Sequence, residues 1–179
     1  MFYQFKAQSS DFIVEELLSA QPSGKGEVLY VYFQKEHLTT MAVLEHLQRS
    51  LPLSRENLGI AGLKDKAGIT RQWITVFKST LEKVGGETRF LSVLSELTTV
   101  LKTTWGDVPL RIGGNGGNRF EVRLRAREAV GAEKKNLIVQ NAEQVKIKGF
   151  PNCFGFQRFG KGMKNFREAK EVIQGKENR

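Results

Sequence analysis

The segment 62–73, Gly-Leu-Lys-Asp-Lys-Ala-Gly-Ile-Thr-Arg-Gln-Trp, has the densest set of side chains capable of chemistry. In it, Asp65 lies between Lys64 and Lys66, with a glycine on either side of the triplet. Neighbouring ammonium groups favour an ionised carboxylate, and glycines let the backbone approach a ligand closely. Such a carboxylate can act as a nucleophile or as a base on a negatively charged substrate. A Lys-Asp-Lys triplet is also typical of a solvated turn, so the residues alone leave both interpretations open.

A second segment, Gly-Gly-Asn-Gly-Gly-Asn at 113–118, resembles a phosphate-binding glycine loop. It lacks the Gly-Lys-Ser/Thr ending of a nucleotide-binding P-loop, and it leads into a strand pattern rather than a helix. A tight turn is therefore the better interpretation, and a P-loop nucleotide hydrolase is a distant alternative.

A third segment, Gly-Phe-Pro-Asn-Cys-Phe-Gly-Phe-Gln-Arg-Phe-Gly at 149–160, combines four phenylalanines with one arginine and three glycines. Aromatic rings stack on unpaired bases while arginine binds the nucleic-acid backbone, so this composition suits RNA binding. The alternative is that several of these rings belong to the core.

The charge balance also favours a polyanionic partner. The 179 residues include 28 Lys and Arg against 19 Asp and Glu, which gives a formal net charge of +9. Binding to phosphates releases condensed counterions, which favours association of a basic protein with nucleic acid. Most of the excess lies in the second half of the chain. A basic surface that only keeps the protein soluble is the alternative.

The remaining composition narrows the class of protein. The single cysteine, Cys153, excludes an internal disulfide, and one cysteine with two separated histidines predicts no zinc cluster. We expect His37 and His46 to have no catalytic role. No apolar run approaches the roughly 18–20 residues of a membrane span, and the start lacks a secretory signal pattern. These features predict one cytoplasmic domain with no metal, cofactor or membrane.

The elements that must position these segments are a mixture of strands and helices. We expect an α+β fold with a largely antiparallel mixed sheet flanked by helices. Strands are predicted over 2–5, 11–16, 27–34, 72–77 and 119–125, and helices from Thr39 or Thr40 to Leu51, over 132–147 and over 164–174.

Alternation and helical spacing also predict which side chains face the core. Phe120, Val122 and Leu124 should point inward, with the arginines between them outward. In the helix over 132–147, we expect Ile138, Ala142 and Val145 to be buried. The helix over 164–174 has an apolar stripe that needs a packing partner, made of Phe166, Ala169, Val172 and Ile173.

Four motifs together resemble the TruD-type tRNA pseudouridine synthases, which isomerise uridine to pseudouridine in RNA. Gly-Leu-Lys-Asp-Lys-Ala at 62–67 is similar to the family's catalytic motif, and 6–16 is similar to its amino-terminal motif. Gly-Asn-Arg-Phe at 117–120 matches Gly-Asn-x-Phe. The segment 149–160 matches the Gly-x-Pro-Asn-Tyr-Phe-Gly-x-Gln-Arg-Phe-Gly signature.

The resemblance implies roles for individual residues. Asp65 would be the catalytic aspartate, and Lys6 would reach the active site and position or polarise its carboxylate. Asn118 would support the catalytic loop, and Phe120 would contact the target nucleotide. Further substrate contacts are implied for Lys64, Gln157, Arg158 and Phe159.

This sequence departs from the family pattern in two residues and in length. Cys153 stands where the family usually has tyrosine, and Val28 where it often has histidine. Family members are roughly twice as long and have an inserted domain after Gln-Arg-Phe-Gly. Residues 1–179 therefore resemble the first part of a pseudouridine synthase catalytic domain, with the inserted domain and the remaining catalytic half absent.

The implied function is isomerisation of uridine in tRNA, at position 13 in the family, without a cofactor. Asp65 would either attack the anomeric carbon or remove the neighbouring ribose proton, and the sequence does not choose between these routes. Two alternatives stay open. The chain is a non-catalytic RNA-binding module, or it is a truncated or split fragment that needs the missing remainder of the enzyme as its partner.

Overall fold

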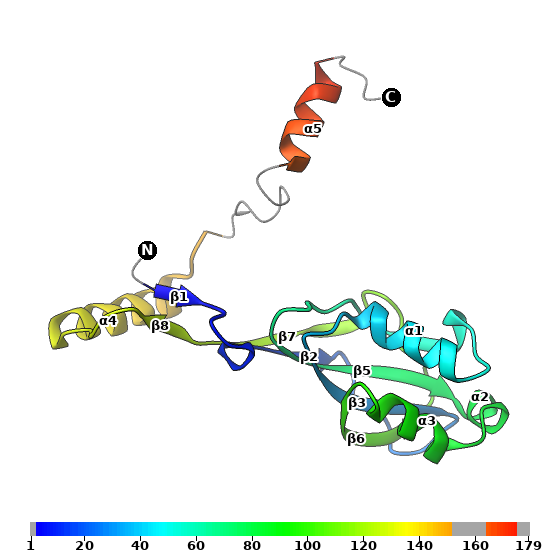
Figure 1. The fold of residues 1–179 in the computed structure, drawn as a ribbon. Helices are drawn as coiled ribbons and strands as arrows, with labels where there is room; N and C mark the ends of the chain where they lie inside the picture. Colours follow the sequence, from blue (N-terminus) through cyan, green and yellow to red (C-terminus); the bar gives the residue numbers. More distant parts are fainter. Residues whose placement is uncertain (1–2, 152–163, 175–179) are drawn as a thin grey trace. The chain divides into compact units, whose positions relative to one another are not determined.

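A computed structural model describes residues 3–151 and 164–174 of the chain (Figure 1). Their contacts group the chain into two compact units, residues 1–128 and 129–179. The positions of the two units relative to one another are not determined, so each is described by itself.

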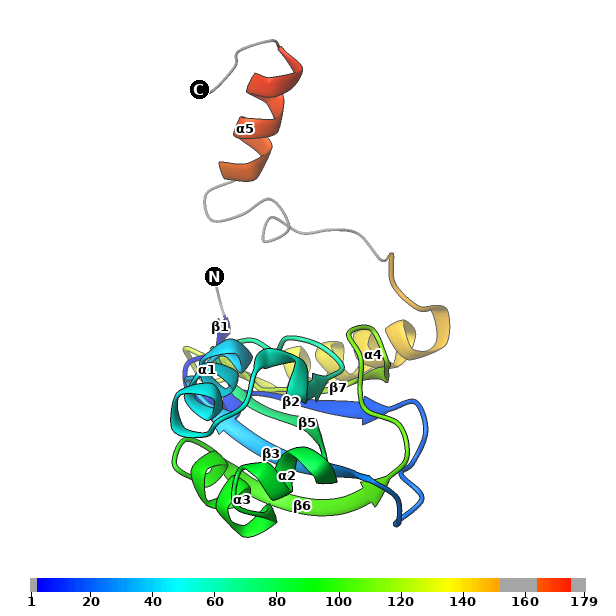
Figure 2. The same cartoon turned by 90° about the vertical axis from the view of Figure 1, so that its right-hand side faces the viewer.

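The first unit is built on a six-stranded mixed sheet. Its strands follow the order β6-β3-β5-β2-β7, visible from one edge to the other in Figure 2, and β4 pairs with β5 beside β2. Among these pairings only β2 with β5 is parallel. The strand bounds are β2 Phe12–Leu18, β3 Val28–Glu36, β4 Leu58–Ile60, β5 Ile69–Phe77, β6 Thr99–Gly106 and β7 Asn115–Val122.

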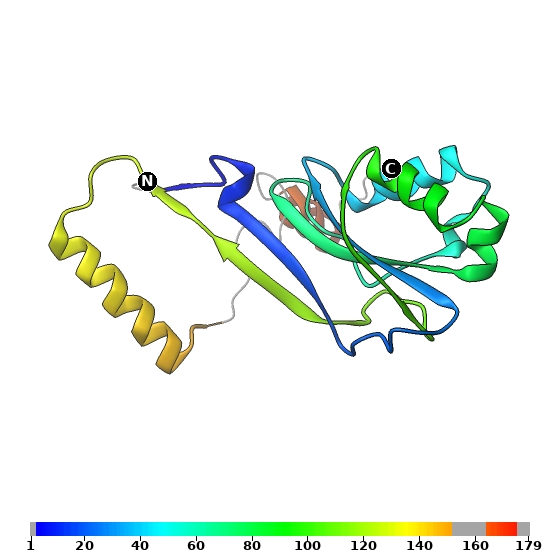
Figure 3. The same ribbon diagram turned by 90° about the horizontal axis from the view of Figure 1, so that it is seen from below.

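Three helices cover one face of this sheet (Figure 3): α1 Thr40–Ser50, α2 Lys78–Lys83 and α3 Glu87–Ser95. Leu29, Val31 and Phe33 of β3 enter the main core beneath these helices, as their alternation predicts. The other face is covered in part by a smaller cluster that includes Tyr30 and Trp73. The predicted α+β fold with a largely antiparallel sheet is therefore confirmed.

The first helix begins and ends as the sequence predicts. The Thr39 hydroxyl accepts a hydrogen bond from the Ala42 N–H at 3.1 Å, so Thr39 is the N-cap. The helix ends before Pro52. The sequence reading did not predict α2, α3 or β6, although Phe90, Val93 and Leu94 of α3 recur at helical spacing and are buried.

Before β2, a 3-10 turn over Ser9–Asp11 brings a buried carboxylate under the sheet. The Asp11 carboxylate accepts hydrogen bonds from Nε and Nη2 of Arg125 at 2.8–3.0 Å. Arg125 belongs to β8, Leu124–Ala126, which pairs antiparallel with β1, Tyr3–Phe5 (Figure 1). This bidentate pair holds the pKa of Asp11 below its usual value.

The prediction of one strand over 119–125 with an inward apolar face is wrong. The strand is interrupted at Arg123, whose N–H donates to the Asp11 carbonyl at 2.8 Å. Phe120, Val122 and Leu124 are 59%, 48% and 59% exposed, because they lie beyond the region that α1–α3 cover. Arg125, predicted to face outward, instead binds the buried carboxylate.

The second unit contains helices α4, Ala132–Lys148, and α5, Lys164–Ile173, which agree with the predicted helices. The predicted burial of Ile138, Ala142 and Val145 is wrong, since no residue of α4 is buried. Its apolar residues include the consecutive run 137–139, so they do not form one narrow stripe. On α5, Val172 and Ile173 are 68% and 85% exposed.

Candidate active site

The loop over 61–68, between β4 and β5, presents Asp65 at the surface, as predicted. Its backbone is held from two sides. The Lys64 N–H donates to the hydroxyl of Thr40 at 3.0 Å, and the Lys35 ammonium donates to the Asp65 carbonyl at 3.0 Å. The end of the loop lies against β2, because a Cβ on Gly68 would lie 2.5 Å from the Phe12 carbonyl oxygen. The backbone of the loop is therefore fixed, although its aspartate is exposed.

The buried ammonium of Lys35 also joins this loop to the segment before α1 through hydrogen bonds. Lys35 is 2% exposed, and its ammonium donates to the Leu38 carbonyl at 2.7 Å and the Lys64 carbonyl at 3.4 Å. Burial lowers the pKa of Lys35 to about 8, and the Asp65 carboxylate acts in the opposite direction. The sequence reading missed this residue, because a lysine within a strand is typically solvent-facing.

Asp65 and Lys6 come together as the resemblance implies. The Lys6 Nζ lies 3.8 Å from the Asp65 Oδ2, with side chains 25% and 59% exposed. The same ammonium lies 3.7 Å from the centroid of the Phe12 ring and 5.2 Å from that of Phe5. Cation–π attraction thus holds Lys6 beside the carboxylate. The carboxylate next to this fixed cation is exposed and therefore accessible to a substrate.

A cavity of about 180 Å³ opens beside Asp65. Val14 of β2 and Asn118 and Phe120 of β7 line it, together with Leu63 and Lys64 from the loop. The exposed Phe120 ring lies 6.1 Å from the Phe12 ring, centroid to centroid. The structure therefore brings Asp65, Asn118, Phe120 and Lys64 to one cavity, with an exposed aromatic ring beside a carboxylate.

The ammonium of Lys64 is already paired within the protein. Its Nζ lies 2.9 Å from the Glu16 Oε1, and the two side chains are 8% and 0% exposed. Glu16 also accepts a hydrogen bond from the Trp73 N–H at 3.0 Å, so Lys64 is tied to β2 and β5. A substrate contact by Lys64 stays a prediction, and its observed contacts hold the loop.

Three predicted substrate contacts, Gln157, Arg158 and Phe159, lie outside the described residues, as does Cys153. A tight turn lies at the start of the glycine-rich segment, where the Gly114 N–H donates to the Arg111 carbonyl at 2.8 Å. The Gly113 N–H donates to the Ala61 carbonyl at 2.8 Å, so this turn contacts the start of the loop over 61–68. The predicted tight turn is confirmed for 113–114, while residues 115–118 belong to β7.

The sequence reading also missed Phe12 and Glu16, which hold Lys6 and Lys64. Phe12 and Glu16 lie on the same face of β2, at every second position with Val14 between them. This shared face is the signal that could have indicated their burial. Over residues 3–151 and 164–174, no three His, Cys, Asp or Glu side chains are grouped to hold a metal ion. None of the helices in these ranges is long and apolar enough to cross a membrane.

Comparison with known proteins identifies the family of this chain. The tRNA pseudouridine synthase D family model matches residues 1–178. The tRNA pseudouridine synthase D of Helicobacter hepaticus is 34% identical over 172 residues, which cover 96% of this chain and 43% of the relative. The tRNA pseudouridine synthase D of Shewanella oneidensis is 37% identical over 169 residues, which cover 94% of this chain and 43% of the relative.

The fold has a solved counterpart as well. The crystal structure of a TruD protein from Methanosarcina mazei matches with a TM-score of 0.73 and 25% sequence identity. The match covers 97% of this chain and 39% of that one. The chain thus spans less than half the length of the relatives named here. Because the family model matches nearly all of it, the chain belongs to the tRNA pseudouridine synthase D (TruD) family.

Proposed function

We propose that this chain provides the catalytic aspartate of an enzyme that isomerises uridine to pseudouridine in tRNA. The observation that supports the proposal most directly is the Lys6–Asp65 pair beside the cavity formed with Phe120 and Asn118. In this reaction the bond from uracil N1 to the ribose C1′ breaks and a bond from C5 to C1′ forms. N1 gains a proton and C5 loses one, so no oxidant, reductant or co-substrate is needed.

Asp65 suits either route to breaking the glycosidic bond. Its carboxylate attacks C1′, or it removes the neighbouring ribose proton to give a glycal. Lys6, held by Phe12, lies beside the carboxylate and limits its orientations. Asp65 is 59% exposed at its side chain, so a nucleotide can approach it.

The target uridine must leave its stack before it reaches this carboxylate, at a cost of about a few kcal/mol. Stacking on an aromatic ring contributes about 1–3 kcal/mol per base. In the proposal the exposed Phe120 ring provides this contact and Asn118 contacts the same nucleotide. The ring therefore offsets much of the cost of extruding the base.

The proposed substrate is tRNA, with position 13 as the target, and the proposed compartment is the cytoplasm. The net charge of +9 supports a polyanionic substrate. In the full proposal, the catalytic domain also uses the part of the enzyme that relatives have beyond this chain. The relatives' length supports this step, since the chain spans 43% of the Helicobacter hepaticus protein.

A second candidate is a catalytically incomplete RNA-binding fragment of such an enzyme. The observation that favours it is the exposed apolar surface of the first unit, where Phe5, Val122 and Leu124 are 48–59% exposed. Exposed apolar residues grouped in this way are typical of surfaces that another polypeptide covers.

Pseudouridine formation on an unmodified tRNA transcript separates the two candidates. Wild type and Asp65→Ala are assayed alone and with the carboxy-terminal remainder of a full-length relative. The proposal predicts product only with Asp65 present, and salt-sensitive tRNA binding by both proteins. If wild type gives product only when the remainder is added, the chain is a catalytically incomplete fragment. If neither protein gives product even then, while both bind tRNA, the chain is a non-catalytic RNA-binding module. If Asp65→Ala gives as much product as wild type, the assignment of Asp65 is wrong.

A further inference from the structure

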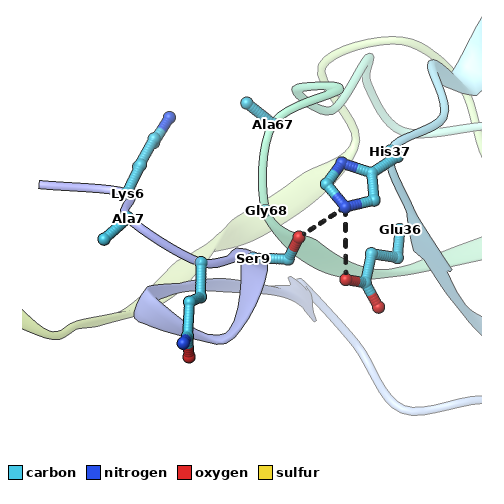
Figure 4. A pocket seen from close by; sticks show the side chains of 8 residues that line it. Lys6, Ala7, Ser9, Glu36, His37, Ala67 and Gly68 are labelled. Carbon is cyan, nitrogen blue, oxygen red and sulfur yellow. Dashed lines mark hydrogen bonds and ion pairs between the residues drawn. The ribbon is translucent and has the colours of Figure 1, made fainter.

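A second cavity of about 410 Å³ is lined in part by Lys6 (Figure 4). Three segments line it. They are the turn after β1, the end of β3 with the residue that follows it, and the end of the loop over 61–68. Their lining residues are Lys6–Ser9, Glu36, His37, Ala67 and Gly68.

The backbone around this cavity is strained at two places. Lys6 and His37 both have φ of 54°, and they are the non-glycine residues with positive φ in the described part of the chain. Such conformations are uncommon outside glycine and cluster at ligand-binding and catalytic sites. Both of these residues line the same cavity, which indicates that its walls are held in place for a ligand.

The polar groups of the cavity are oriented by one another. The His37 Nε2 lies 2.8 Å from the Ser9 hydroxyl and 3.5 Å from the Glu36 Oε1, as the dashed lines in Figure 4 show. Yet the His37 and Glu36 side chains are 74% and 47% exposed, so their remaining hydrogen-bonding capacity faces solvent. The cavity wall thus presents a carboxylate acceptor beside an imidazole and a hydroxyl.

The two cavities share the catalytic pair. Residues 63–65 of the loop line the first cavity, and Ala67 and Gly68 line the second. Lys6 lines the second cavity, and its ammonium lies 3.8 Å from Asp65 in the first. An RNA strand that places a uridine against Asp65 therefore has a neighbouring nucleotide within reach of the second cavity.

The charges of the wall indicate which part of that nucleotide binds. The Lys6 ammonium is paired with Asp65, and the Glu36 carboxylate would repel a phosphate, whereas it accepts hydrogen bonds from N–H groups of a base edge. Adenine, guanine and cytosine each have an exocyclic amino group that uracil lacks. We propose that this cavity binds the base next to the target uridine, and that Glu36 and His37 select a base with an exocyclic amino group. The proposal rests on the proposed function, since it takes RNA as the substrate.

Equilibrium binding of short, fluorescently labelled single-stranded RNAs tests this selection. Each RNA has one target uridine, and the base on one side of it, then on the other, is varied among A, G, C and U. Wild type is compared with Glu36→Ala and His37→Gly, because glycine accepts the positive φ at 37 and the variant keeps the backbone geometry. Glu45→Ala, which removes an exposed carboxylate from α1, is the matched control.

On one side of the uridine, wild type and Glu45→Ala are expected to bind the amino-bearing bases about tenfold more tightly than uracil. In Glu36→Ala and His37→Gly this preference should fall below about twofold, with little change in binding of the uracil RNA. Three results would each overturn the proposal: no base preference in wild type, an unchanged preference in both variants, or no RNA binding. Because binding is measured rather than turnover, the preference can be present even if no pseudouridine is formed, so the two proposals fail separately.

Discussion

At the scale of single residues, the site combines an exposed carboxylate with a fixed backbone. The Asp65 carbonyl accepts a hydrogen bond from buried Lys35, while its carboxylate faces Lys6. The position of the Asp65 carboxylate thus depends on two side chains, Lys35 and Lys6, that do not line the first cavity. Preorganised charges of this kind stabilise a transition state without a cost of reorganisation.

Lys6→Met should slow pseudouridine formation about 10²-fold in single-turnover assays, since removing one preorganised electrostatic partner has an effect of about this size. Stability should change little, because the Lys6–Asp65 pair is partly exposed. Lys66→Met is the matched control, because Lys66 is an exposed lysine that directly follows Asp65 in the sequence. Equal rates for Lys6→Met and wild type would exclude Lys6 from the mechanism.

Lys35→Met tests the buried lysine through the pH dependence of stability. The pKa of Lys35 is about 8 in the folded protein, against 10.5 as its ordinary value. Below about pH 8 Lys35 is protonated in both the folded and the unfolded protein, so burial of its charge destabilises the folded state by a constant amount. Between pH 8 and 10.5 the unfolded state binds more protons, so the free energy of unfolding of wild type rises with pH.

The measurement is urea unfolding of wild type and Lys35→Met from pH 7 to 10. The difference between their free energies of unfolding should be flat up to about pH 8 and then shift in favour of wild type. A difference that stays constant over the whole range would show that the pKa of Lys35 is not lowered.

At the scale of elements, the start of β5 and the start of β2 position the loop. Ile13 and Ile69 pair in the parallel register, and Gly68 has φ of 122° directly before this pairing. The loop over 61–68 therefore ends where Gly68 lies against Phe12 of β2. A side chain at this position has no room.

Gly68→Ala should lower the free energy of unfolding by about 1–3 kcal/mol, because alanine is strained at this φ and its Cβ meets the Phe12 carbonyl. Gly131→Ala is the control, since its φ is −62° and nothing lies within 4 Å of its Cβ. Urea unfolding of both variants gives the comparison. Equal stability of the two variants would contradict the close approach of loop and strand.

The elements differ in how far the sequence predicts them. Leu29, Val31 and Phe33 alternate along β3, and Thr39 and Pro52 bound α1, so local patterns were sufficient there. The strand predicted over 72–77 begins earlier, at Ile69 of β5, where five consecutive buried residues replace alternation. Alternation in β7 showed which side chains share a face, but not whether anything covers that face, so Phe120 was predicted inward. The Asp11–Arg125 pair joins residues 114 positions apart, and no local pattern reveals such a contact.

In the candidate site, too, local patterns reveal some features and long-range packing determines the others. The types of Asp65 and its neighbours indicated possible chemistry, but only the family resemblance connected Lys6 and Phe120 with it. The contacts of Lys35 with three carbonyls depend on the packing of α1 against β3, which the sequence does not describe. Local sequence therefore predicts the reacting group better than the residues that hold it.

At the scale of the whole molecule, the net charge of +9 should govern binding to tRNA. The dissociation constant is expected to rise about 10²-fold or more between about 50 and 200 mM salt, because several phosphate contacts release counterions. Arg119→Gln should reduce the slope of log Kd against log salt by about one, since this side chain is 75% exposed beside Phe120.

Fluorescence anisotropy over a salt series gives these slopes. Lys78→Gln on α2 is the control, with a side chain 52% exposed and a sequence position remote from the catalytic segments. A Kd independent of salt would contradict phosphate binding. Equal slopes for Arg119→Gln and wild type would place the RNA away from β7.

The central claim is that Asp65 isomerises the target uridine. It is tested most directly by site-specific quantification of pseudouridine in a tRNA transcript after single-turnover reaction with wild type, Asp65→Asn and Asp107→Asn, each with the remainder of the enzyme supplied. Asn preserves the shape of the side chain and removes its charge, and Asp107 is the other exposed aspartate of the chain. We expect product at one uridine with wild type and Asp107→Asn, and none with Asp65→Asn. Product from Asp65→Asn at the wild-type rate would contradict the account.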